Sequence, residues 1–83
     1  MRRYTVLLYP EPEDRGYSVL VPVLSVATQG ETIDEALARA RELITFQVDC
    51  LEAEGDDVPA EELPPIVATI DIAESVPADV VPA

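Results

Sequence analysis

The sequence predicts a small α+β domain in which three strands are followed by one helix and a fourth strand, with the helix on one face of a mixed sheet. Two short segments rich in β-branched and aromatic residues precede a stretch of helical periodicity, and a segment of period-two alternation follows it. With 83 residues the chain has room for one domain with a thin core. We expect this domain to span residues 1–72 and a C-terminal tail to span residues 73–83.

The first two strands are expected to form a hairpin. Residues 3–9 carry apolar side chains on both faces, and we expect Pro10 and Pro12 to end this strand because proline cannot donate to a sheet. Residues 11–16 are typical of a turn, and residues 17–21 form the second strand. The short connection predicts that the two strands pair antiparallel.

A third strand near residues 27–29 leads into the helix. Gly30 turns the chain, and Thr32 and Glu35 match a capping box, in which both side chains satisfy backbone N–H groups at the helix start. Gly55 is a typical C-terminal stop. The helix is therefore predicted between Thr32 and Gly55.

The predicted helix carries two apolar surfaces. At 100° per residue, a stripe that faces the sheet comprises Ile33, Ala36, Leu37, Ala40, Ile44, Val48 and Leu51. A second patch, displaced around the helix, comprises Leu43, Phe46 and Cys50. Either the C-terminal tail covers this second patch or it forms a contact between subunits. Because one helix covers only one face of the sheet, we expect a homo-oligomer, most simply a two-fold dimer.

An acidic, proline-rich connection over residues 55–65 precedes the fourth predicted strand. In this strand Ile66, Ala68, Ile70 and Ile72 alternate with Val67, Thr69 and Asp71, which gives one distinctly apolar face. A helical crossover normally places such a strand parallel to a neighbour. Residues 73–83 contain two prolines, so we expect this tail to be flexible or to dock on a partner subunit.

The charge of the chain narrows its possible partners. Asp and Glu number 17 and Lys and Arg together 5, which gives a net charge of −12. The negative electrostatic potential of such a chain repels the phosphate backbones of nucleic acids. We therefore expect no direct binding of nucleic acid and a preference for a cationic partner. No segment has the length and apolar character of a membrane span or a secretory signal. We therefore expect a cytoplasmic protein that binds no membrane.

The residue composition also excludes several kinds of catalytic and metal-binding site. Histidine is absent and Cys50 is the single cysteine, which excludes Ser-His-Asp and Cys-His catalysis, thiolate zinc sites and an internal disulfide. A two-metal nuclease needs converging carboxylates, but the first predicted strand has none. Asp34 and Glu35 suit a helix start, and Asp71 an exposed strand face. We expect no enzyme activity, no metal and no cofactor, with a metal-dependent nuclease as an alternative.

Three stretches together resemble the HicB antitoxin family. They are residues 17–22 (YSVLVP), 28–32 (TQGET) and 34–37 (DEAL), in the order of a strand that ends in proline, a Thr-Gln-Gly turn and a helix start. The resemblance spans residues 3–55, and residues 66–72 fit it less specifically. It implies a partial ribonuclease H-like topology, which agrees with the predicted order of elements.

The resemblance also implies a function. HicB proteins neutralise HicA-type toxins, which are small, basic, mRNA-cleaving proteins. Full-length family members carry a C-terminal DNA-binding domain, which we do not expect residues 73–83 to form because these 11 residues include two prolines and no basic residue. We therefore expect toxin neutralisation without direct operator binding.

Two acidic clusters are candidates for the contact with a toxin. They are Glu11, Glu13 and Asp14 in the hairpin loop, and Glu52, Glu54, Asp56 and Asp57 at the helix end. Solvated acidic loops are the structural alternative for both clusters. The functional alternative is an oligomeric interaction or scaffold domain that has no toxin partner.

Overall fold

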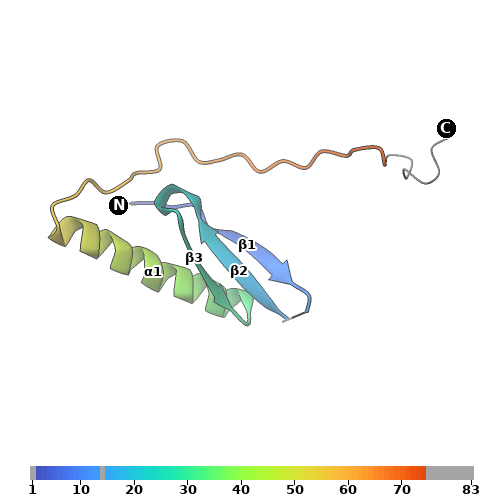
Figure 1. The fold of residues 1–83 in the computed structure, drawn as a ribbon, viewed down its shortest axis with the longest axis horizontal. Coiled ribbons are helices and arrows are strands. Elements are labelled where there is room, and N and C mark those ends of the chain that lie inside the picture. Colours follow the sequence, from blue (N-terminus) through green and yellow to red (C-terminus); the bar gives the residue numbers. More distant parts are fainter. Residues whose placement is uncertain (1, 14, 75–83) are drawn as a thin grey trace, which may run out of the picture.

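The computed structural model of the chain describes residues 2–13 and 15–74 (Figure 1). A three-stranded antiparallel sheet of order β1-β2-β3 comprises β1 (Leu7–Glu11), β2 (Gly16–Val21) and β3 (Val26–Gly30). A short 3-10 helix over Pro22–Leu24 joins β2 to β3. Helix α1 (Ile33–Ala53) lies across one face of the sheet and packs mainly on β3 and β2. The predicted α+β class, the three antiparallel strands and the helix are confirmed.

Strand β1 begins and ends later than predicted. It runs through Pro10, which lies opposite Tyr17, and reaches Glu11. Because β1 is an edge strand, a proline is tolerated where its nitrogen faces away from the neighbouring strand. The prediction that Pro10 ends the strand was therefore wrong.

The core lies between α1 and the sheet and is small. Val19 and Val21 of β2 and Ala36 and Ala40 of α1 are almost completely buried. Val19, Ala36 and Ala40 form one cluster, and three partly buried side chains pack against it, namely Val6, Leu8 and Tyr17. The alternation of side chains along the strands places Leu7, Tyr9 and Leu20 on the opposite face, away from α1.

The helix buries small residues rather than large ones. Ala36 and Ala40 are buried in the contact with the sheet, whereas Ile33 and Leu37 are 50% and 46% exposed. Because α1 lies close to the sheet, the sheet covers only a narrow strip of the helix surface. In addition, Ile33 is the first residue of α1. The predicted sheet-facing stripe is thus correct for Ala36, Ala40 and Val48, all of them buried, and wrong for the two large residues near the helix start.

Gly30 makes the close approach possible. This residue is buried at the end of β3, and a Cβ on it would lie 2.5 Å from the backbone nitrogen of Ala36 and 2.6 Å from its Cα. Backbone atoms cannot give way at such distances without moving the helix. Glycine is therefore required here by the packing of α1 on β3.

Both ends of α1 are capped, with Thr32 and Gly55 in their predicted roles, whereas the Glu35 carboxylate accepts from the N–H of Glu31 and not from that of the N-cap residue Thr32. The Thr32 Oγ1 accepts a hydrogen bond of 3.0 Å from the Glu35 N–H, and the Glu35 carboxylate accepts one of 3.3 Å from the Glu31 N–H. At the other end Gly55 has a φ of +75°, and the N–H of Asp56 donates to the carbonyl oxygen of Leu51 at 2.9 Å. This is the Schellman arrangement, which glycine favours because it adopts positive φ without strain.

After α1 the chain crosses the N-terminal segment and then leaves the body of the domain (Figure 1). The Tyr4 hydroxyl donates to the Pro59 carbonyl at 2.7 Å, and the Thr5 N–H donates to the Glu61 carboxylate at 2.8 Å. The radius of gyration is 18.3 Å, whereas a compact chain of this length has about 12 Å. The difference reflects the extended segment.

The structure corrects the prediction of a fourth strand over residues 66–72. Within the described part of the chain, residues 56–74 form neither helix nor strand. The contact that ties Glu61 to Thr5 uses a side chain rather than a backbone ladder, and Pro64 and Pro65 follow without an N–H to donate. The described segment after Glu61 therefore starts no backbone hydrogen-bond ladder with the sheet. Most of the predicted tail, residues 75–83, lies outside the described residues.

We predict that Gly30→Ala lowers the free energy of unfolding by about 3 kcal/mol, because the added methyl group forces α1 away from β3. Urea unfolding followed by circular dichroism measures this loss. Gly55→Ala is the matched control, since open space surrounds Gly55 and only its positive φ opposes the change, for a loss of about 1 kcal/mol. Equal losses for the two variants would contradict the packing role of Gly30.

Candidate functional site

Four chain segments meet at the hairpin end of the domain. The register sets Glu11 opposite Gly16 and Tyr17 opposite Gly30, so the end of β1, the start of β2 and the end of β3 lie together. Helix α1 begins directly after β3. An open groove of about 730 Å³ lies among these segments and is lined by Glu11, Gly16, Tyr17, Ser18, Thr28, Gln29, Gly30, Glu31, Glu35 and Arg39.

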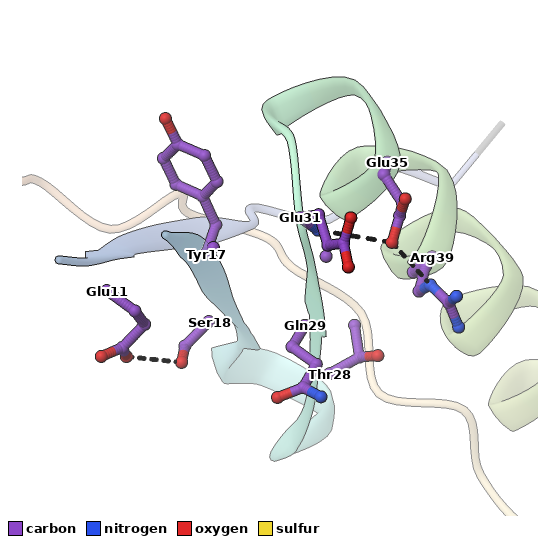
Figure 2. Close-up of a pocket in the computed structure, with 10 residues that line it drawn as sticks. Glu11, Tyr17, Ser18, Thr28, Gln29, Glu31, Glu35 and Arg39 are labelled. Carbon is purple, nitrogen blue, oxygen red and sulfur yellow. Dashed lines mark hydrogen bonds and ion pairs between the residues drawn. The ribbon is translucent and has the colours of Figure 1, made fainter. Parts of the chain in front are cut away.

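Carboxylates border this groove on both sides (Figure 2). The Ser18 hydroxyl donates to the Glu11 carboxylate at 2.6 Å and orients it along β1. On the helix side, the Glu35 carboxylate lies 3.5 Å from the Arg39 Nε and also accepts from the Glu31 N–H. Among the described residues, neither Glu11 nor Glu31 forms an ion pair. These two carboxylates can therefore accept hydrogen bonds from cationic groups of a partner.

The second acidic cluster lies at the opposite end of α1. Glu52 forms an ion pair with Arg2 at 3.6 Å, whereas Glu54, Asp56 and Asp57 are exposed. Because α1 has 21 residues, about 30 Å separates its two ends. The structure thus keeps the two predicted clusters apart.

The helix-end acids lie where the helix dipole opposes them. The carbonyl end of a helix carries partial negative charge, and the last turn of α1 contains no basic residue. The positions of Glu54 and Asp57 therefore reduce the stability of the helix.

The hairpin cluster differs from the prediction in its membership. Glu11 lines the groove, Glu13 is exposed in the turn beside it, and Asp14 lies outside the described residues. Glu31 and Glu35 join Glu11, although the sequence reasoning assigned Glu35 only to the cap and did not single out Glu31. The signal that finds them is the strand register, which brings the start of α1 next to the hairpin end.

The predicted apolar patch on the other side of α1 is partly accessible. Phe46 is 65% exposed, and Leu43 and Cys50 are half-buried. Within the described residues the chain after α1 does not cover Phe46. Its role as a subunit contact stays a prediction.

The described residues contain neither a metal-binding cluster nor a membrane-spanning helix. No three or more Cys, Asp or Glu side chains of residues 2–13 and 15–74 lie together in a way that holds a metal ion. In the same part of the chain, α1 is not apolar enough to cross a membrane.

The fold and the surface define a small acidic α+β domain with an open polar groove at its hairpin end. The chain is 41% identical over 61 residues to the UPF0150 protein ssr1765 of Synechocystis sp., a match that covers 72% of this chain and 76% of that protein. The chain therefore belongs to the UPF0150 family. No family model matches it, and no solved structure matches it significantly. The name of the relative states no activity or partner.

We predict that Glu54→Lys stabilises the protein by about 0.5 kcal/mol at low salt, because a cation suits the negative end of α1. Urea unfolding at low and at high ionic strength measures this gain, which salt should reduce. Glu42→Lys, at an exposed position in the middle of α1, is the control for the change in net charge. The dipole account fails if both variants gain equally.

Proposed function

We propose that this chain is a HicB-like antitoxin, a binding protein that neutralises a small basic HicA-type ribonuclease by protein-protein contact. The observation that carries the proposal is the groove at the hairpin end, where Glu11 and Glu31 present carboxylates that form no ion pair within the described residues. The resemblance of residues 17–37 to the HicB family supplies the identity of the partner. Membership of the UPF0150 family is compatible with this function, and the name of the family states no function of its own.

Charge supports the choice of partner. A ribonuclease that holds mRNA needs basic side chains for the phosphates, and an acidic protein competes for the same side chains. A net charge of −12 also steers such a partner toward the chain before contact. Neutralisation by competition for these cations needs no catalysis, metal or cofactor in the antitoxin.

Shape favours the hairpin end over the helix end as the contact. The groove offers Tyr17, Ser18 and Gln29 beside its carboxylates, so it can hold a cationic side chain through both charge and hydrogen bonds. Each end contains one paired carboxylate, Glu35 with Arg39 in the groove and Glu52 with Arg2 at the helix end, so the preference rests on the hydrogen-bonding side chains of the groove. We therefore propose the groove as the toxin contact.

The second candidate is an oligomeric interaction or scaffold domain without a toxin partner. One observation favours it: the extended segment after α1 exposes several large apolar side chains, which is typical of surfaces that assemble. The two functions are separated by testing inhibition directly.

The test is an RNA-cleavage assay with a purified small basic HicA-type ribonuclease from the same organism as this chain. We expect stoichiometric inhibition at micromolar concentration, weakened by added salt because the contact is electrostatic. Inhibition that is absent at every concentration would reject the antitoxin function and leave the scaffold domain.

Two matched double variants locate the contact. We predict that Glu11→Lys with Glu31→Lys weakens inhibition by about tenfold or more, since two charge pairs are reversed. Glu54→Lys with Asp57→Lys changes the net charge by the same amount and should retain inhibition near the wild-type level. The reverse pattern would place the contact at the helix end and overturn its assignment to the groove.

A further inference from the structure

The arm, which we define as residues 63–72, exposes an unusual amount of apolar surface for its length. The exposed fractions are 88% for Leu63, 91% for Ile66, 76% for Val67, 77% for Ile70 and 79% for Ile72. Residues 63–70 contain no charge, in a chain of which 27% of residues are charged. Apolar stretches of this kind are rarely left in water and mark surfaces that are covered in the working state.

The root of the arm is fixed to the body of the domain. Tyr4 and Thr5 hold Pro59 and Glu61 by the hydrogen bonds described above. Pro64 and Pro65 then restrict the chain to an extended form immediately before the apolar alternation. This stiff connection directs the arm outward (Figure 1) and away from the sheet of its own chain.

The sheet has a free edge next to this root. Strand β1 pairs only with β2, so its outer edge has unpaired backbone groups except at Pro10, which has no N–H, and β1 begins shortly after Thr5. An unpaired edge beside an unpaired extended segment is a template for strand addition. The edge of β3 is less suitable because the acidic Glu31 and the start of α1 lie beside it.

We propose that two copies of this chain exchange their arms, so that residues 66–72 of each copy add as a fourth strand along β1 of the other. Each copy has one arm and one free β1 edge, and a two-fold axis satisfies both at once with identical contacts. The row of Ile66, Ala68, Ile70 and Ile72 then extends the apolar surface beside Val6 and Leu8. The exchange supplies the missing strand and goes beyond any contact with a toxin.

Sedimentation and hydrogen exchange on the chain of 83 residues test the proposal. We expect twice the mass of one chain at micromolar concentration. We also expect slowed exchange of the amides of residues 66–72 that is lost when dilution dissociates the dimer. A monomer with a protected arm would show that the strand adds to its own sheet. A monomer with an unprotected arm, or a dimer with an unprotected arm, would also overturn the exchange.

Single substitutions with matched charge separate the arm from other surfaces. Ile70→Lys should convert the dimer to a monomer, whereas Ala60→Lys, which adds the same charge before the arm, should leave the dimer intact. Because Ile70 lies outside the core, the Ile70→Lys chain should keep its helical circular dichroism signal at concentrations where it is a monomer. Dissociation by Phe46→Lys but not by Ile70→Lys would assign the dimer to the helix patch and refute the exchange.

Discussion

The contact between the end of β3 and the first turns of α1 determines how the rest of this domain is built. Gly30 has no side chain, and Ala36 and Ala40 have the smallest ones that helices favour, so the helix backbone lies directly on the sheet. The same turn sets the direction of α1, because Thr32 caps the helix two residues after β3 ends. A helix held this close buries little side-chain volume, and the core is correspondingly small.

A small core leaves other apolar groups without partners inside one chain. Leu7, Tyr9 and Leu20 lie on the face of the sheet that α1 does not cover, and the arm carries its isoleucines into solvent. A chain of this size gains little net stability from one thin core, so a second copy that covered such groups, as we propose, would contribute to folding as well as to assembly. The proposed exchange of arms therefore follows from the same constraint as the close helix contact.

In the proposed dimer, the contact between copies and the contact with a cationic partner would use different parts of the domain. The residues just before the arm, Pro59 and Glu61, are held by Tyr4 and Thr5 beside the helix end of the domain. The acidic groove lies at the hairpin end. An arm that adds to β1 would use the outer edge of that strand, and Glu11 is the one β1 residue among those that line the groove. A dimer of this kind presents two acidic grooves, one from each copy, to cationic partners.

Local signals predicted much of the fold, and non-local pairing accounts for most of the errors. The bounds of α1 follow from Thr32 and Gly55, whose capping geometry depends on a few neighbouring residues. The bounds of β1 and the secondary structure of residues 66–72 depend instead on which strand lies beside them. The alternation of apolar and polar residues does not identify that neighbouring strand. The groove illustrates the same limit, because Glu31 joins Glu11 only through the register of three strands.

The most direct measurement is an isotope-filtered nuclear Overhauser experiment on a dimer made by mixing labelled and unlabelled chains. The exchange of arms predicts cross-peaks between the methyl groups of Ile66, Ile70 and Ile72 of one copy and the protons of β1 of the other. Cross-peaks from the arm to β1 within the same chain only, or none between the arm and any strand, would contradict the account.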